Sequence, residues 1–332
     1  MSLPAIRAVR KVFPHARLAV VARPWVAELY ARETAIDEVI VYRAQKGLRA
    51  KREFAARLRE ERFECGILLQ NAFDAALMAW MARIPVRIGY KRDARGLLLT
   101  QAVPVPEPGD IPRHERFYYL ELLRRAGLIE RFPLVTDIRL DGIEAARDAG
   151  ARRIAALGIA GDVVGISPGA AYGNAKRWLP ERFAETAARL SRSVLVFGSA
   201  AERTLCEEVA GGLRRARVQV TNLAGETSLS EFIELAAACR FFLTNDSGAM
   251  HVASALGVHT VSVFGSTDDT TTGPTGPYAR VVRTHAECSP CLRRECPIDH
   301  RCMTRVSADA VAAAALHLWE ESARQWTHEA RS

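Results

Sequence analysis

The chain has 332 residues, 49% of them hydrophobic and 25% charged, which is typical of a globular protein and excludes a disordered one. No run of about 18 apolar residues is present, and the start lacks the apolar core of a signal peptide, so we expect a cytoplasmic protein without a transmembrane helix. The net charge of +8 comes without a nucleic-acid-binding motif, and therefore predicts a phosphorylated sugar or an anionic lipid surface as partner and no nucleic acid.

Short apolar runs alternate with helical patterns through the first half of the chain. This alternation indicates a parallel sheet covered by helices, and the four prolines in 103–112 indicate a surface loop. The predicted strands are 17–21, 39–41, 65–70 and 86–89, and the predicted helices are 2–12, 24–32, 48–62, 74–83 and 114–126.

The second half repeats the same pattern, so we predict an α/β protein of two Rossmann-like domains, 1–155 and 156–332. The chain opens on a helix where a doubly wound domain would have a strand, and we expect that first N-terminal strand to be missing. The second series is predicted as helix 143–157, strands 163–167, 194–198, 218–222, 241–244 and 260–265, and helices near 180–190, 201–214, 229–239 and 249–256.

The stretch 241–257 contains the first candidate for a ligand site. Its apolar start predicts a buried strand, which ends in turn and cap residues before a helix. Where such a strand meets a helix start, free backbone N–H groups and the helix dipole favour an anion. Gly248 allows a phosphate to approach the backbone, and Asp246 or Ser247 can cap the helix or contact a ligand hydroxyl. An ordinary capped turn is the alternative.

The second candidate is the loop 167–178, which follows a predicted strand and precedes a predicted helix. Gly169 and Gly173 permit close backbone approach, and Lys176 and Arg177 supply two cations. A lysine beside a departing diphosphate stabilises the charge that grows during transfer. A flexible glycine loop with a solvated lysine is the alternative.

Three further loops follow strands in the same half. Glu202 can accept hydrogen bonds from a ribose, or it can be an acid at a helix start. Thr227 can border a nucleobase, although a helix cap is the simpler interpretation. The hydroxyl-rich stretch 265–277 can close over a ligand or form a surface loop.

Four of the seven cysteines are clustered near the C-terminus, with His300 beside them. In a cytosolic chain this clustering favours a structural zinc or an iron–sulfur cluster, or reduced thiols, over disulfides. The spacing matches neither a zinc ribbon nor a ferredoxin. The clustered residues are Cys288, Cys291, Cys296 and Cys302, whereas Cys65, Cys206 and Cys239 lie in apolar contexts and are expected in the core.

Taken together, these segments resemble the bacterial ADP-heptose:lipopolysaccharide heptosyltransferases of glycosyltransferase family nine, most closely the heptosyltransferase II type. Weaker likeness extends through residues 1–130, so nearly the whole chain is covered. The segments that carry the resemblance are Gly169–Trp178, Thr244–Ala253, Phe264–Tyr278 and Cys288–Thr304.

The resemblance implies a GT-B architecture, in which two Rossmann-like domains face each other across a cleft. Domain 1–155 would receive the lipopolysaccharide inner core, and domain 156–332, which includes the Cys-rich segment 288–302, would bind ADP-heptose. It further implies an inverting direct displacement that requires no metal, in a protein peripheral to the cytoplasmic face of the inner membrane.

The resemblance also assigns individual residues. Lys176 matches the lysine that contacts the diphosphate, and Asp246 matches the residue that contacts the heptose, so both are predicted to be catalytic. The other predicted donor-binding residues are Ala170, Ala171, Glu202, Thr227, Ser247, Gly248 and His251.

One family feature has no counterpart in this sequence. The family's proposed general base is an Asp in a Gly-Asp turn ahead of the segment matched by the first residues, and Asp37, Asp74 and Asp93 are not substitutes. We therefore expect an internal start and a chain that binds the donor but transfers heptose poorly. The alternatives are a relative with another sugar or acceptor, and a donor-binding remnant.

Overall fold

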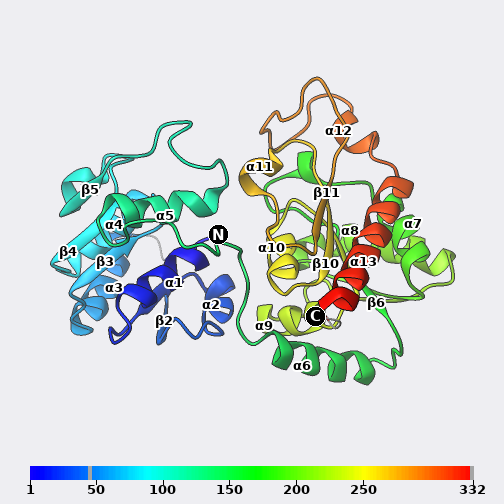
Figure 1. Cartoon of the computed structure of the whole chain (residues 1–332), viewed down its shortest axis with the longest axis horizontal. Coiled ribbons are helices and arrows are strands. Elements are labelled where there is room, and N and C mark those ends of the chain that lie inside the picture. The colour runs from blue at the N-terminus through cyan, green and yellow to red at the C-terminus, as the bar shows by residue number, and fades with distance from the viewer. Residues whose placement is uncertain (44–46, 330–332) are drawn as a thin grey trace. The chain divides into compact units, whose positions relative to one another are not determined.

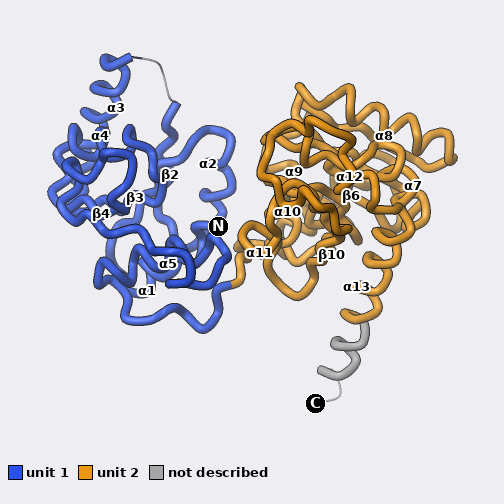
Figure 2. The backbone as a smooth tube through the Cα atoms, turned by 90° about the horizontal axis from the view of Figure 1, so that it is seen from above, with its two compact units in different colours: residues 1–136 blue, residues 137–332 orange. Residues whose placement is uncertain are grey.

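The computed structural model describes the backbone of residues 1–43 and 47–329 and the side chains of the same residues up to 322. The chain forms two compact units, Met1–Thr136 and Asp137–Ser332 (Figures 1 and 2). Each unit has parallel sheets and covering helices, which confirms the predicted α/β class.

Unit 1 contains a two-stranded parallel sheet, β1–β2, and a three-stranded parallel sheet, β3–β4–β5. Its helix α3 buries Phe54, Ala55 and Leu58 and leaves a basic face outside, as its amphipathic pattern predicts. The strands of this unit are β1 (Ala19–Ala22), β2 (Glu38–Val41), β3 (Cys65–Leu68), β4 (Val86–Tyr90) and β5 (Gln101–Val103), and its helices are α1 (Leu3–Val12), α2 (Pro24–Tyr30), α3 (Leu48–Glu60), α4 (Phe73–Met81), η1 (Arg95–Leu98) and α5 (Glu115–Arg125).

Unit 2 is built on a six-stranded parallel sheet with the order β11–β10–β9–β6–β7–β8. Its strands are β6 (Val163–Ser167), β7 (Ser193–Val196), β8 (Gln219–Asn222), β9 (Phe241–Asn245), β10 (His259–Val263) and β11 (Ala279–Val282). The helices and helical turns are α6 (Ile143–Ala156), η2 (Asn174–Lys176), α7 (Pro180–Leu190), η3 (Ala200–Glu202), α8 (Arg203–Arg215), α9 (Leu229–Ala237), α10 (Gly248–Ala255), α11 (Asp269–Thr272), α12 (Arg301–Thr304) and α13 (Ala308–Glu329).

The order of this sheet is that of a doubly wound nucleotide-binding fold. The chain runs outward from β6 through β7 to β8, and then returns to place β9 on the other side of β6. The order therefore reverses between β6 and β9, and ligands of such sheets bind beyond the carboxyl ends of the strands at this switch point. Both strands are fully buried, so the two loops that follow them begin from a rigid base.

The structure places the boundary between the units ahead of α6, whereas the predicted division at 155/156 put this helix in the first domain. Arg153 of α6 donates from Nε to Glu234 Oε2 of α9 at 2.7 Å. Gly150 lies so close to α9 that a Cβ there would be 1.9 Å from the carbonyl oxygen of Glu234. Helix α6 therefore packs on unit 2 and belongs to it.

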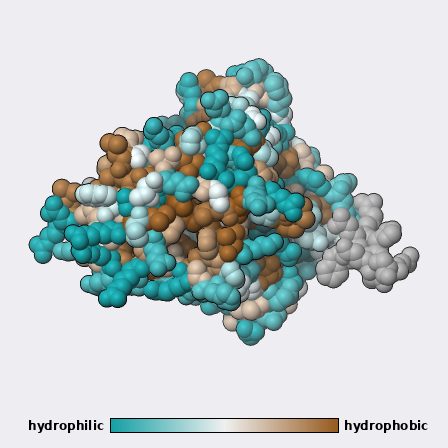
Figure 3. Space-filling model, turned by 60° about the vertical axis from the view of Figure 1, so that its left-hand side comes forward, coloured by the Kyte–Doolittle hydropathy of each residue, from teal (hydrophilic) through white to brown (hydrophobic). Residues whose placement is uncertain are grey.

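Several elements were not predicted, among them β5, β11, α13 and the short helices α11 and α12. The strands β5 and β11 are short and lie in stretches rich in turn residues, and α13 was left without a prediction. Among the described residues, no helix is both long and apolar enough to cross a membrane. The face drawn in Figure 3 exposes hydrophobic residues in patches among hydrophilic ones.

Candidate functional site

The loops after β6 and β9 meet because these strands are neighbours. Ser167, the last residue of β6, is paired in register with Thr244, near the end of β9. The loop after β6 contains Lys176, and the turn after β9 contains Asp246. Two segments predicted independently as ligand loops therefore lie together at the switch point of the sheet.

A buried carboxylate forms the centre of the site. Lys176 Nζ donates to Asp246 Oδ2 at 2.5 Å, and Thr267 Oγ1 donates to the same oxygen at 2.7 Å. The side chain of Asp246 is 5% exposed and that of Lys176 is 14% exposed. Thr267 comes from the loop after β10, so loops from three adjacent strands, β6, β9 and β10, converge on one oxygen atom. The charged hydrogen bond keeps the ammonium group at the surface of the site.

Asn245 joins the two loops from inside the protein. Its side chain is fully buried, and its Oδ1 accepts a hydrogen bond from the backbone N–H of Trp178 at 2.9 Å. Its Nδ2 donates to the carbonyl oxygen of Pro168 at 2.7 Å. One amide therefore fixes both ends of the loop that carries Lys176 and satisfies two backbone groups that would otherwise be buried without partners.

The start of α10 has the features expected of an anion site. Ser247 is the N-cap in an extended conformation, and its side chain makes no capping hydrogen bond. Its hydroxyl lies 3.1 Å from Thr244 Oγ1 instead. Gly248 is exposed, and no heavy atom lies within 4 Å of the position that a Cβ would take. The space beside the first residue of α10 is therefore open, and His251 is half-buried on the first turn.

Glu202 has a structural partner as well as a place beside the lysine loop. Its Oε2 accepts from the backbone N and the hydroxyl of Ser199, at 2.9 and 2.8 Å, as part of a capping box at η3. A Cβ on Gly169 would be 2.0 Å from Glu202 Oε1, so the carboxylate packs directly on the loop after β6. This position is compatible both with a contact to a ribose and with a purely structural role as an acid at a helix start.

The other predicted donor-binding residues lie around the same strand ends. Ala170 is 2% exposed and belongs to the wall of the loop, whereas Ala171 is exposed. Thr227 is half-buried just before α9, where the capping residue is Ser228, whose hydroxyl accepts from Glu231 N at 3.1 Å. Thr227 is therefore not the helix cap.

The four clustered cysteines are not arranged as a metal site in the part of the chain that the structure describes. All are free, and within residues 1–43 and 47–322 no group of three or more His, Cys, Asp or Glu side chains is arranged to hold a metal ion. Cys302 is 6% exposed and packs in the hydrophobic core of unit 2, and burial raises the pKa of its thiol. Cys288, in contrast, is exposed. The predicted zinc or iron–sulfur cluster is therefore not supported by the arrangement of the described side chains.

The Cys-rich segment instead supports the lysine loop. Tyr172 Oη donates to the carbonyl of Leu292 at 3.0 Å, and the backbone N of Ala175 donates to the carbonyl of Arg294, also at 3.0 Å. Leu292 N in turn donates to Ser266 O at 2.7 Å, next to Thr267. The segment therefore links the loops after β6 and β10, which both reach Asp246.

The ring of Tyr172 organises the cations of the site. Lys176 Nζ lies 4.7 Å from the ring centroid, and the guanidinium carbon of Arg294 lies 5.1 Å from it. The sequence analysis missed Tyr172, Arg294, Asn245 and Thr267. Tyr172 sits inside the glycine loop, and an aromatic residue there was the available signal, whereas the partners from distant loops carry no local signal.

Comparisons with known proteins identify the family of this chain. The model of glycosyltransferase family 9 (heptosyltransferase) matches residues 51–301, which is more than half of the chain. Lipopolysaccharide heptosyltransferase 2 of Salmonella typhimurium is 31% identical over 293 residues, 85% of this chain and 84% of that protein. Lipooligosaccharide heptosyltransferase 2 of Campylobacter jejuni is 36% identical over 165 residues, 48% of this chain, and the match spans only 52% of that relative.

A solved structure has the same fold over nearly its whole length. ADP-heptose lipopolysaccharide heptosyltransferase II of Escherichia coli superposes with a TM-score of 0.81 and 27% identity, covering 97% of this chain and 95% of that one. The likeness confirms the predicted GT-B fold. The chain therefore belongs to glycosyltransferase family 9, the heptosyltransferases.

Proposed function

We propose that this protein transfers heptose from ADP-heptose to the inner core of lipopolysaccharide. The observation that carries the proposal is the pairing of Lys176 and Asp246 at the point where the sheet order reverses, beside a helix start that is open to an anion. Nucleotides bind sheets of this kind at that point. The family and the relatives named above support heptose and lipopolysaccharide as substrates.

In this proposal unit 2 binds the donor. The diphosphate lies against the first N–H groups of α10, where Gly248 leaves room, and Lys176 turns from Asp246 toward the phosphates as they arrive. The positive charge near the bridging oxygen stabilises the leaving ADP as the glycosidic bond breaks. In this proposal Glu202 and Thr227, which follow the neighbouring strands β7 and β8, contact the ribose and the base.

Asp246 contacts the heptose rather than acting as the base. Its Oδ2 already accepts from Lys176 and Thr267, and its Oδ1 can accept a hydrogen bond from a sugar hydroxyl. The acceptor hydroxyl attacks the anomeric carbon from the side opposite the ADP and passes its proton to water, while the bond to ADP breaks and the configuration inverts. No cofactor takes part in this displacement. Unit 1 supplies the acceptor-binding surface, at the cytoplasmic face of the inner membrane.

The test is a transfer assay with the whole chain. Purified protein is incubated with ADP-heptose and with an inner-core acceptor that already bears one heptose, and the product is analysed by mass spectrometry. The proposal expects a gain of one heptosyl unit that depends on ADP-heptose. Transfer from a different nucleotide sugar, with none from ADP-heptose, would refute the choice of donor. ADP binding without transfer to any core acceptor would refute the choice of reaction.

A further inference from the structure

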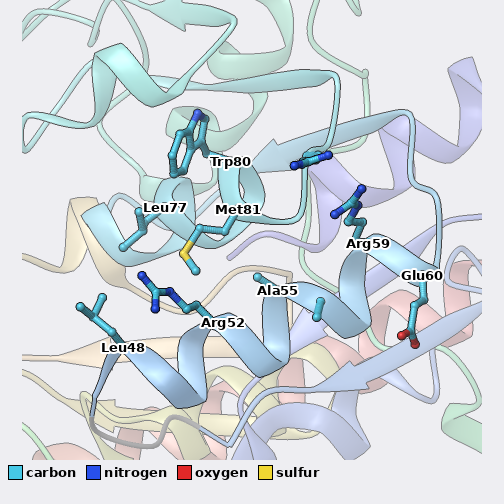
Figure 4. A pocket seen from close by; sticks show the side chains of 10 residues that line it. Leu48, Arg52, Ala55, Arg59, Glu60, Leu77, Trp80 and Met81 are labelled. Carbon is cyan, nitrogen blue, oxygen red and sulfur yellow. The ribbon is translucent and has the colours of Figure 1, made fainter.

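Outside the donor site, unit 1 has a groove between two surface helices. The groove has a volume of about 940 Å³ and lies between α3 and α4, which Figure 4 shows from close by. Ala55 of α3 and Met81 of α4 both line the groove. We define the α3–α4 groove by the six residues that carry the argument below: Leu48, Leu77, Trp80, Arg52, Arg59 and Arg83.

The apolar residues of the α3–α4 groove are unusually exposed. Leu48 is 61% exposed and Trp80 is 52% exposed, and Leu77 lies between them in the lining. Tryptophan combines a large apolar ring with one N–H donor, which suits a boundary where one side is apolar and the other is wet. A partner that covers this groove must therefore offer apolar surface at its middle.

The charged residues of the α3–α4 groove require a partner that carries negative charge. Arg52, Arg59 and Arg83 are exposed, and none of them makes an ion pair with another of the described residues. Other cations of α3 are already neutralised, since Arg49 pairs with Glu53 and Lys51 with Asp74. Glu60 is the acid among the lining residues, so the groove keeps a clear positive excess.

We propose that the α3–α4 groove binds the surface of a membrane that contains anionic phospholipids. The arginines bind the phosphates of the headgroups, and their long stems let them do so while Trp80 and Leu48 enter the boundary with the acyl chains. Exposed aromatic and leucine side chains flanked by cations on one helical face are typical of proteins that lie on such membranes. The inference deepens the proposed function, because it names the surface that holds unit 1 at the membrane.

The first experiment measures binding of the whole chain to lipid vesicles by co-sedimentation. Wild type is compared with R52Q/R59Q/R83Q and with a matched control, R152Q/R192Q/R215Q, which removes three exposed arginines from unit 2. Each cation near an anionic surface is worth roughly five-fold in affinity, so the groove variant should bind phosphatidylglycerol vesicles about a hundred-fold more weakly. The control should stay within about two-fold, and all three proteins should bind phosphatidylcholine vesicles weakly.

A second variant tests the apolar half of the proposal. L48Q/W80Q keeps the charge of the α3–α4 groove, so it should still bind anionic vesicles at low salt but lose the binding that wild type retains at high salt. The blue shift of tryptophan emission on vesicle addition should also be lost in W80F, because Trp80 is the indole that enters the lipid.

Two outcomes would overturn the inference. One is an equal loss of vesicle binding in the groove variant and the control, which would mean that net charge alone matters. The other is unchanged vesicle binding together with loss of a dimer in sedimentation velocity, which would make a second copy of the chain the occupant. Calorimetric binding of ADP and transfer to a delipidated core acceptor are measured on the same proteins. They should be unaffected by the groove substitutions, so a failure of the proposed function is seen separately.

Discussion

Replacing Asn245 with alanine is expected to destabilise unit 2 and to loosen the loop that holds Lys176. The substitution removes the acceptor for Trp178 N and the donor to Pro168 O in a position that has no access to water. Both backbone groups then lose the partner that the structure gives them and stay buried.

The magnitude follows from the two lost hydrogen bonds. A buried polar group left without a partner costs about 1–3 kcal/mol, so the two together reduce the free energy of unfolding by about 2–6 kcal/mol. For a domain of this size each kcal/mol lowers the melting temperature by about 2–4 °C. A shift of roughly 10 °C is therefore expected for the transition of unit 2.

The assay combines thermal unfolding with amide hydrogen exchange. The peptide that contains Trp178 should exchange faster in Asn245→Ala than in wild type, since its N–H has lost its acceptor, while peptides of unit 1 should be unchanged. Asn174→Ala, in the exposed part of the same loop, is the matched control and should shift the unfolding free energy by less than about 0.5 kcal/mol. If Asn245→Ala behaves like this control, the reasoning about the bridging amide is wrong.

Three further predictions concern the same site. Lys176→Met should lower turnover by about 10²–10³-fold, because it removes the charge that stabilises the leaving group. It should also lower the free energy of unfolding by about 1–3 kcal/mol, because the buried Asp246 carboxylate loses its cation. Steady-state assays and chemical denaturation should show that adding Asp246→Asn restores stability but not turnover. Tyr172→Ala should raise the KM for the donor several-fold more than it lowers kcat, because it removes the ring that positions Lys176. Tyr172→Phe should retain this ring contact, and equal kinetics of the two variants would argue against a positioning role for the ring. Burial raises the pKa of Cys302, so less of its thiolate is present at pH 8. Mass spectrometry should therefore find that iodoacetamide alkylates Cys302 far more slowly than the exposed Cys288 in the native protein, and equally fast in denaturant. Similar rates in the native protein would contradict the burial of Cys302.

The elements of the fold could be predicted because their signals are local. Buried strands such as Phe241–Asn245 are apolar runs that end in turn residues, and helices such as α7 begin at a proline. The short strands β5 and β11 lack such a run. Helix α6 was predicted as a helix, but its assignment to unit 2 depends on the close contact of Gly150 with α9, which the sequence does not reveal.

The positions of Lys176 and Asp246 could be predicted for a related reason. Both follow buried strands of one parallel series, and such strand ends share an edge of the sheet. Their partner Thr267 could not be chosen from a stretch full of hydroxyl residues, because only the pairing of β9 with β10 brings it to Asp246. The capping box at Ser199 was visible as a Ser-x-x-Glu pattern, and it explains one role of Glu202 without deciding the other.

Of the alternatives predicted for the clustered cysteines, the metal site is not supported, whereas reduced thiols agree with the structure. Spacing along the chain suggests shared ligation, but it does not say which way each thiol faces. Cys302 lies next to Met303 and is buried in the core, whereas Cys288 is exposed. Cys288, Cys291 and Cys296 nevertheless lie near enough for their charges to add to the effect of burial in raising the pKa of the Cys302 thiol.

The most direct test of the account is a calorimetric titration of the whole chain with ADP, repeated with adenosine and with the Lys176→Met variant. The site between β6 and β9 predicts one ADP per chain, much weaker binding of adenosine because the diphosphate is absent, and at least ten-fold weaker ADP binding in the variant. ADP that fails to bind, or that binds wild type and variant equally well, would contradict the claim that Lys176 and the start of α10 hold the diphosphate of the donor.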